Sequence, residues 1–307
     1  MVLMTVQNSD AGYVVGIDIG GTNFRIGAVD QNGALLASAH ESSRRFFGGA
    51  DAVQALGDYI DTFQKRVSGE LRGICAGFPG TVAKDKSRVL SCPNLPAFTN
   101  VNVGRPLAAR FGVPALAEHD VILLLENDMR AAGLHGQDCV MAVYLGTGLG
   151  NAMYIHGRFL DGKNGVSGEL GHIPVLGSDA PCPCGNRGCI ELWSSGKRLE
   201  QLQEEHFPAL EDFRTLFTLH AGDPAIDGYL DCVATAIAAE INILDPDTVL
   251  LSGGVLNMPD FPYERLLDRI RLHTRKPYPA EALCFLRGVQ DKYAGIRGAA
   301  SYLWSRL

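Results

Sequence analysis

Three cysteines within eight residues form the most chemically distinctive group in this sequence. Cys182, Cys184 and Cys189 lie in the segment PCPCGNRGC, whose glycines allow tight turns that bring thiolates to one centre. Three sulfur ligands leave one corner of a tetrahedral Zn²⁺ site open, and His172 lies ten residues upstream of Cys182. We therefore predict a closed Cys₃His zinc site, which is structural because a catalytic zinc keeps an open position. A loop with incidental thiols and a redox pair are the alternatives.

Two acidic residues flank the expected metal ligands. Glu169 precedes His172 by three residues, and Glu191 follows Cys189 by two. A metal that fixes the histidine and the cysteine also fixes both carboxylates, and carboxylates that converge on a polar pocket suit hydrogen bonding to a polyol. The alternative for each acid is a solvated position on the surface.

Three glycine-rich segments each follow an expected strand: Asp18-Ile-Gly-Gly-Thr22, Gly146–Gly150 and Ser252-Gly-Gly254. Backbone N–H groups of such turns can converge on an anion, so the first two are expected to hold phosphates from two sides. Asp18 can hold Mg²⁺ through water, and Thr22 adds a hydroxyl donor. The third turn suits a nucleotide's sugar or base, with a helix expected to start near Pro259. Each segment can also be a plain turn.

Two familiar nucleotide-binding motifs are absent from the sequence. It contains no GxxxxGK[ST], which excludes a P-loop, and no G-x-G-x-x-G that opens a helix after the first strand. The second absence counts against a dinucleotide-binding domain.

The elements that must position these residues can be predicted from apolar periodicity. Strands are expected at 13–19, 24–29, 34–39, 71–78, 115–118, 140–145, 151–155, 248–251 and 282–286. Helices are expected at 52–67, 105–111, 120–134, 225–244, 263–273 and 294–306. The pattern of strand, glycine turn and strand occurs once in each half, which we interpret as a weak internal repeat. Each copy is expected to begin a domain, with a boundary near residue 117.

Length and composition limit the remaining possibilities. The 307 residues favour two domains, and the 46% hydrophobic and 20% charged content is typical of a globular chain. A net charge of −7 disfavours nucleic acid as a main partner, and no apolar run is long enough for a membrane helix. The opening MVLMTVQNSDAG lacks the pattern of an export signal, so we expect a cytoplasmic protein whose other cysteines are free thiols.

Several motifs occur together in one order along the chain. They are Asp18-Ile-Gly-Gly-Thr, Gly77-Phe-Pro-Gly80, Glu169-Leu-Gly-His172 and Cys182-x-Cys-Gly-x-x-Gly-Cys189-x-Glu191. From about residue 13 to the C-terminus the chain resembles the ROK family, which contains bacterial sugar kinases and sugar-responsive repressors. Finer motifs, such as Ser91-Cys-Pro-Asn-Leu-Pro96 and Gly165-Val-Ser-Gly-Glu-Leu-Gly-His-Ile-Pro174, are most similar to the family's kinases for D-allose.

The resemblance implies a fold and a domain organisation. The fold is α/β, a two-domain actin-like ATPase of the hexokinase-like, ribonuclease H-like type with its active site in a cleft between the domains. The smaller N-terminal domain comprises residues 1–117 plus the last helix, 293–307. The larger domain comprises residues 118–292 and includes the zinc loop.

The resemblance also implies roles for individual residues. Nucleotide-binding places fall on Asp18, Gly20, Gly21, Thr22, Asn23, Gly146, Thr147, Gly148, Gly253 and Gly254. Sugar-binding places fall on Gly80, Asn94, His119, Asp120, Glu169, His172 and Glu191. The cofactors are Mg·ATP and structural zinc, the latter on His172, Cys182, Cys184 and Cys189.

The catalytic base requires a choice between two aspartates. The family uses the Asp of an Asn-Asp pair that follows a strand, and Asn127-Asp128 matches by letter. Six residues after Pro114, however, comes Asp120, and twenty-five residues further comes Leu145, next to the second glycine turn. This spacing favours Asp120, so that His119 replaces the family's Asn. An altered donor there suits a sugar other than glucose, although His119 can also merely pack at a strand end.

These inferences together predict an ATP:hexose 6-phosphotransferase, with D-allose as the expected sugar. Glucose, mannose, fructose or N-acetylmannosamine is the alternative within the family. A non-catalytic sugar-binding module and a sugar-sensing repressor are alternatives of another class. Only 17 residues precede Asp18, which we expect to be too few for a DNA-binding domain. The expected partners are sugar and ATP, without nucleic acid or membrane, and a homodimer is compatible with the family.

Overall fold

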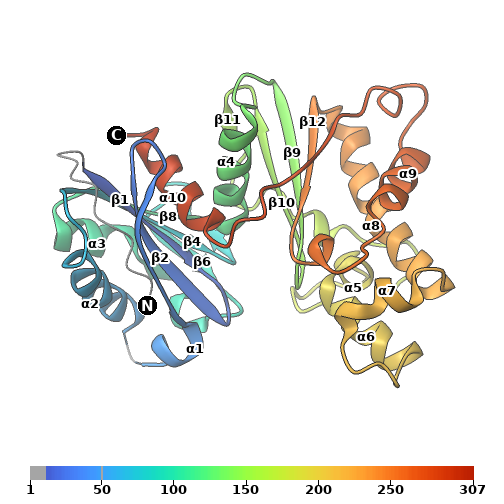
Figure 1. Ribbon diagram of the computed structural model, residues 1–307, viewed down its shortest axis with the longest axis horizontal. Coiled ribbons are helices and arrows are strands. Elements are labelled where there is room, and N and C mark those ends of the chain that lie inside the picture. Colours follow the sequence, from blue (N-terminus) through green and yellow to red (C-terminus); the bar gives the residue numbers. More distant parts are fainter. Residues whose placement is uncertain (1–11, 50) are drawn as a thin grey trace. The chain divides into compact units, whose positions relative to one another are not determined.

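Residues 12–49 and 51–307 are described by the computed structural model of the protein, whose internal contacts divide the chain into two compact units (Figure 1). Unit 1 contains the chain up to Gly133, Asp161–Ser167 and Val289–Leu307, whereas unit 2 contains Leu134–Leu160 and Gly168–Gly288. Most of the opening segment that bears on an export signal lies outside the described residues.

Unit 1 is built on a five-stranded sheet in the order β3-β2-β1-β4-β8. Its strands are β1 (Tyr13–Ile19), β2 (Asn23–Asp30), β3 (Leu35–Ser42), β4 (Leu71–Phe78) and β8 (Ala115–His119). Its helices are α1 (Ser43–Phe46), α2 (Ala52–Gln64), α3 (Gly104–Phe111), α4 (Asp120–Ala132) and α10 (Ala294–Trp304). The first three strands form the expected antiparallel meander, while β4 and β8 run parallel to β1.

The alternation of side chains along β1 decides what each face of this sheet carries. Val15 and Ile17 belong to the buried core that includes α2. Gly16 and Asp18 lie on the opposite face, where they contact α10. Figure 1 shows α10 beside this sheet. A Cβ atom on Gly16 would lie 2.2 Å from the carbonyl oxygen of Ile296, so a glycine is needed for the helix to approach. Asp18 consequently faces α10.

A small three-stranded sheet in unit 1 is missing from the sequence prediction. It consists of β5 (Thr81–Val82), β6 (Arg88–Ser91) and β7 (Val101–Asn102). The division into units also differs from the expected boundary near residue 117, because α4 packs against α10 and both belong to unit 1.

Unit 2 is built on a second five-stranded sheet in the order β11-β10-β9-β12-β13. Its strands are β9 (Cys139–Leu145), β10 (Leu149–Ile155), β11 (Arg158–Phe159), β12 (Thr248–Ser252) and β13 (Phe285–Arg287). Its helices are α5 (Glu191–Ser194), α6 (Gly196–His206), α7 (Leu216–His220), α8 (Pro224–Leu244) and α9 (Tyr263–His273). The long helix α8 begins where Asp223 accepts a hydrogen bond from the amide of Ala225, with Pro224 in the first helical position.

The two sheets have the same plan of strands. In each, three antiparallel strands are followed by two strands that run parallel to the first. The weak internal repeat inferred from the sequence is therefore confirmed.

Two sequence predictions about unit 2 need correction. The expected strand 282–286 is only Phe285–Arg287, and the third glycine turn is not followed by a helix that starts near Pro259. A single 3-10 turn, Val255–Asn257, follows the third glycine segment instead. The separate prediction of a helix at 263–273 is confirmed by α9. No helix among the described residues combines the length and apolar composition that crossing a membrane requires.

Candidate active site

The carboxyl ends of three neighbouring parallel strands gather polar residues in unit 1. Asp18 at the end of β1 pairs with Gly77 of β4, and Phe78 of β4 pairs with His119 at the end of β8. Asp120 follows directly as the first residue of α4. A Cβ atom on Gly77 would lie 2.8 Å from a methyl carbon of Leu123, so the glycine lets α4 start close to the strand. Strand ends of this kind commonly bind ligands in open α/β sheets.

Asp18 is held between an arginine and the first turn of α10. The guanidinium of Arg25 on β2 lies 3.6 Å from its carboxylate. A Cβ atom on Gly295 would lie 2.7 Å from Asp18 Cγ, so the helix contacts the acid without an intervening side chain. Burial raises the pKa of Asp18, while Arg25 acts in the opposite direction.

Asp120 has the properties of a general base that works near neutral pH. Burial, and then the nearby carboxylate of Asp18, raise its pKa to about 7. Its side chain remains 28% exposed, so a substrate hydroxyl can reach it. One oxygen accepts a hydrogen bond of 2.8 Å from the amide of Val121, and the imidazole Nε2 of His119 lies 3.7 Å from that same oxygen. A carboxylate with a pKa close to the working pH is well suited to proton abstraction.

Asp128, the alternative base, has a different environment inside α4. It is 3% exposed, and its carboxylate accepts a hydrogen bond of 2.9 Å from the amide of Val289. The side-chain amide of Asn127 lies 3.5 Å from the same oxygen. Asp128 thus fastens the segment that leads into α10.

The first glycine turn connects β1 to β2 and lies beside Asn94. The amide of Gly20 donates to the carbonyl of Asn23 at 2.9 Å, which closes the turn. A Cβ atom on Gly21 would lie 3.0 Å from the Cβ atom of Asn94, so the predicted sugar-side residue contacts the predicted phosphate-side turn. Thr22 and Asn94 are exposed.

Gly80 has a packing requirement of its own. A Cβ atom there would lie 2.1 Å from the carbonyl oxygen of Ser91, so only glycine fits against β6.

The second and third glycine turns lie at the ends of β9 and β12 in unit 2. The amide of Gly146 donates to the carbonyl of Gly148 at 3.0 Å, and Thr147 between them is exposed. Gly253 has a φ of +113°, and a Cβ atom there would lie 2.3 Å from the carbonyl oxygen of Leu145. The tight contact and the positive φ both require glycine, whereas nothing lies within 4 Å of a Cβ atom on Gly254.

Glu191 ties the helix after the cysteines to the second glycine turn. It is the first residue of α5, and its Oε2 accepts a hydrogen bond of 2.8 Å from the amide of Leu149. A Cβ atom on Gly148 would lie 2.5 Å from the same oxygen. The turn therefore needs its glycine to accommodate this carboxylate.

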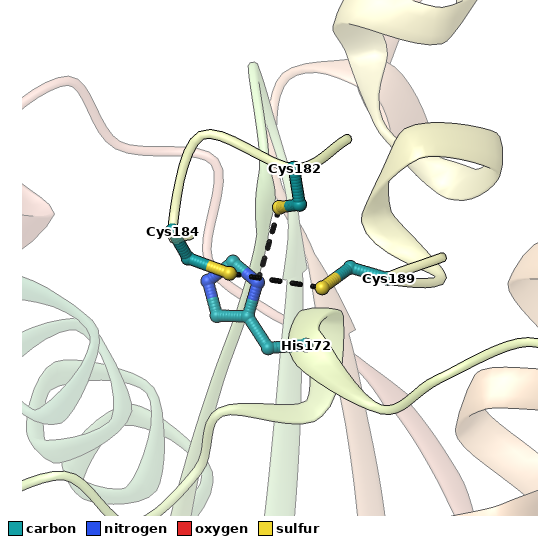
Figure 2. Close-up of side chains that lie close together, drawn as sticks. All are labelled: His172, Cys182, Cys184 and Cys189. Atoms are coloured by element: carbon teal, nitrogen blue, oxygen red, sulfur yellow. Dashed lines mark hydrogen bonds between the residues drawn. The ribbon is translucent and has the colours of Figure 1, made fainter. Parts of the chain in front are cut away.

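The four predicted metal ligands come together in unit 2, and Figure 2 shows their side chains directed toward one another. Their ligand atoms all lie within 4.8 Å of one another. The sulfur atoms of Cys184 and Cys189 are 3.7 Å apart, and Cys182 Sγ is 3.8 Å from His172 Nδ1. A tetrahedral Zn²⁺ with Zn–S bonds of about 2.3 Å has edges of about 3.8 Å. The donor set and its spacing therefore fit zinc.

His172 uses its two ring nitrogens in different directions. Nδ1 faces the thiols, while Nε2 lies 3.6 Å from a carboxylate oxygen of Glu169. The Glu169 side chain is 45% exposed. A ligand that pins Nδ1 also orients the nitrogen beside Glu169, which is how an outer group commonly fixes a metal-bound imidazole.

Sequence reasoning missed two residues that shape this region, Arg25 and Gly295. Both contact Asp18. Arg25 belongs to none of the sequence motifs, and Gly295 is far from Asp18 along the chain. The only available signal was the hairpin register, since the chain reverses between Asp18 and Arg25 and places them opposite each other.

Comparison with known proteins gives the family. The model of the ROK family matches residues 14–306, and the chain belongs to that family. The chain is 28% identical to the glucokinase of Thermotoga maritima over 96% of its own length and 98% of the relative's. It is 29% identical to the N-acetyl-D-glucosamine kinase of Photobacterium profundum, with 93% and 97% covered.

Solved structures agree on the fold. The ROK hexokinase of Thermus thermophilus is 29% identical and matches with a TM-score of 0.78 over 96% of this chain and 99% of its own. The ROK glucokinase of Streptomyces griseus, solved with glucose and AMPPNP, is 25% identical with a TM-score of 0.75, covering 95% and 99%. The expected two-domain actin-like ATPase fold is confirmed.

Proposed function

We propose that the protein is an ATP-dependent hexose kinase that phosphorylates the 6-hydroxyl of a free aldohexose, with D-allose as the preferred sugar. The observation that carries the proposal is the carboxylate of Asp120 at the strand ends of unit 1, with a pKa of about 7 and an exposed edge. The named kinases among the relatives support the reaction class.

Asp120 is the proposed catalytic base. Its carboxylate accepts the proton of the sugar's 6-hydroxyl as that oxygen attacks the γ-phosphate of ATP, and the bond from the γ-phosphorus to the bridging oxygen breaks to release ADP. The hydrogen bond from the amide of Val121 holds one oxygen at a fixed position, which leaves the other for the substrate. The adjacent His119 is proposed to contact a sugar hydroxyl.

The glycine turns are proposed to hold the phosphates. Phosphoryl transfer needs positioning and charge stabilisation more than covalent help from the protein, and backbone amides supply both. Gly20 to Asn23 serve from unit 1, Gly146 to Gly148 serve from unit 2, and Gly253 and Gly254 take the adenosine side. Asp18 suits Mg²⁺, which prefers oxygen ligands and keeps several waters; the bound cation would neutralise charge on the phosphates.

Glu169, His172 and Glu191 are proposed to orient the sugar, together with Asn94 and the backbone at Gly80. Zinc on the Cys₃His set would order the loop that carries these residues and would take no part in the chemistry. The 3.6 Å approach of His172 Nε2 to Glu169 supports one shared hydrogen-bonding surface for these two side chains.

The identity of the sugar rests on finer resemblance. The motifs around Asn94 and Glu169 are most similar to kinases for D-allose, and His119 stands where the family has an Asn. Glucose, mannose, fructose and N-acetylmannosamine remain the alternatives within the family, and the named relatives add N-acetyl-D-glucosamine.

A sugar panel tests the proposal. The purified protein is assayed with Mg·ATP and each of D-allose, glucose, mannose, fructose and the two N-acetylhexosamines by coupled ADP release, and ³¹P NMR identifies the product. We expect the highest kcat/KM for D-allose and a 6-phosphate. A higher kcat/KM for another sugar would replace D-allose, and no phosphorylation of any of them would overturn the hexose kinase.

A further inference from the structure

Lys86 forms an ion cluster inside unit 1 that the mechanism above does not use. It lies in the turn between β5 and β6, where its backbone has a φ of 57°. Its ammonium lies 2.8 Å from one carboxylate oxygen of Glu118 and 2.6 Å from Asp161 Oδ1. The side chains of Lys86 and Glu118 are only 13% and 1% exposed, so water screens this cluster weakly.

One arm of the cluster holds the strand that ends at the proposed base. Besides Lys86, Glu118 Oε1 accepts a hydrogen bond of 2.8 Å from the amide of His119. The carbonyl of Lys86 accepts another of 2.8 Å from the amide of Ala117. Lys86 therefore binds β8 through both its side chain and its backbone, at the residues that precede Asp120.

The other arm holds a segment that leads toward a proposed sugar ligand. Asp161 opens the short stretch Asp161–Ser167, which packs with unit 1 although the chain on both sides of it belongs to unit 2. Gly165 secures the stretch further, because a Cβ atom there would lie 2.1 Å from the carbonyl oxygen of Val82. Glu169 follows the stretch by two residues.

We infer that Lys86 is a positioning residue for sugar phosphorylation, which holds the strand leading to Asp120 through Glu118 and the segment leading to Glu169 through Asp161. The inference rests on the proposed function, since it acts through two residues assigned there. One ammonium pairs with two carboxylates. Its removal leaves the buried Glu118 with no paired cation among the residues that the structure describes, and it frees the segment at the same time.

Three variants separate the two arms. Asp161→Asn weakens only the segment, and we expect the KM for the sugar to rise about tenfold while kcat stays within twofold. Lys86→Met disturbs both arms, so kcat falls as well. Lys84→Met is the matched control, because Lys84 is an exposed lysine two positions away and is expected to match the wild type. The partly exposed Asp161 keeps the test valid if Lys86→Met folds poorly.

A double-mutant cycle shows whether Asp161 acts through Glu169. Calorimetry measures the dissociation constant of the sugar for the wild type, Asp161→Asn, Glu169→Gln and the double variant. We expect Asp161→Asn to weaken binding in the wild type but to change it less than twofold once Glu169 is replaced. Equal weakening in both backgrounds, or unchanged KM in Asp161→Asn, would overturn the inference. A wild type without activity on any hexose would instead overturn the proposed function.

Discussion

At the scale of the single residue, Asp120 is the group whose replacement is most informative. In Asp120→Asn we expect kcat to fall by about 10³-fold, in the range typical of losing a general base, because the amide cannot accept the hydroxyl proton. The dissociation constant of the sugar should stay within about threefold, since the amide keeps the shape and a hydrogen-bonding oxygen. Steady-state kinetics and calorimetry measure the two quantities.

Asp128→Asn is the control for this prediction. Asp128 is buried and accepts from the amide of Val289, so its replacement should lower the melting temperature and leave kcat of the folded protein near that of the wild type. A near-normal rate in Asp120→Asn together with an inactive Asp128→Asn would reverse the assignment of the base.

The raised pKa of Asp120 predicts the pH dependence of the reaction. Burial and the Asp18 carboxylate raise that pKa to about 7, and only the ionised form can accept a proton. The value of kcat/KM should therefore increase about tenfold per pH unit below pH 7 and level off above it. A pH–rate profile from pH 5 to 9 measures this, and a profile that is flat down to pH 5 contradicts the role of Asp120.

The same raised pKa predicts that Asp120→Asn loses activity but gains stability. An unfolded Asp ionises near pH 4 and the folded Asp120 near pH 7, so this group lowers the free energy of unfolding as pH rises between these values. The side chain in Asp120→Asn does not ionise, so the free energy of unfolding of this variant does not fall in this way. We expect the variant to be more stable than the wild type by about 4 kcal/mol at pH 8, with the difference vanishing near pH 4. Urea unfolding at both pH values measures it, and equal stability at pH 8 contradicts it.

At this scale the sequence predicts residues that belong to compact motifs. The structure brings the four predicted metal ligands together, and the sequence could suggest them as a group because 18 residues of chain contain all of them. Arg25 and Gly295 were not predicted, because their contacts with Asp18 depend on a strand register and on a helix from the far end of the chain. Spacing along one segment carries no information about such contacts.

At the scale of the element, the packing of α10 on α4 depends on a glycine. A Cβ atom on Gly298 would lie 1.8 Å from the carbonyl oxygen of Leu123, so Gly298→Ala forces the helices apart. We expect a loss of about 3 kcal/mol in the free energy of unfolding, as for an overpacked core. Chemical denaturation measures the change.

Gly228→Ala is the matched control for this prediction. Gly228 lies within α8, and nothing is within 4 Å of a Cβ atom there. The added methyl group should stabilise the protein by about 1 kcal/mol through helix propensity. Similar destabilisation in both variants would mean that the contact with Leu123 is not the cause.

The proposed zinc site predicts how the loop between β11 and α5 responds to the loss of one ligand. Cys184→Ser removes one thiolate from the Cys₃His set, and we expect the bound zinc to fall from about one equivalent to below 0.2, because structural sites need the complete ligand set. The melting temperature should fall, and the KM for the sugar should rise. Atomic emission spectroscopy measures the metal, with Cys284→Ser as the control at an exposed cysteine outside the cluster. A metal-free wild type with full activity would contradict the zinc site.

Most long elements were predicted, with the 11-residue helix α6 as an exception, and the shortest elements were not. Strand β4 and helix α9 begin and end where apolar periodicity places them, because each buries one continuous face. Strands β5 and β7 have two residues each, and α5 has four. Elements of this length carry no periodicity, and their neighbours hold them in place.

At the scale of the whole molecule, each unit has its own hydrophobic core. One core is formed by residues between Tyr13 and Ala117, and the other by residues between Met141 and Ile270. All four predicted metal ligands belong to unit 2. A disturbance of the metal site should consequently remain in that unit.

Hydrogen exchange tests this separation. Treatment with a zinc chelator should speed amide exchange in residues 170–206 by about tenfold or more, because the loop loses its restraint. Exchange in β1, β4 and β8 should stay unchanged. Equal acceleration in both units would show that the cores are not independent.

The repeated plan of strands explains why the overall organisation was visible in the sequence. Each half begins with a strand, a glycine turn and a second strand, and both patterns are local enough to recognise. The boundary between the units was not visible, because it depends on α4 packing against α10, whose residues are far apart along the chain.

The last helix, α10, helps to position both Asp18 and Asp120. Its Gly295 packs closely against Asp18, and its Gly298 packs closely against α4, the helix that begins at Asp120. Laboratory evolution of this enzyme toward a new sugar should therefore keep α10 constant and diversify the exposed positions around Asn94, a proposed sugar ligand. Shortening the chain from its C-terminus would not remove a dispensable tail, because it would misplace both carboxylates in a single step.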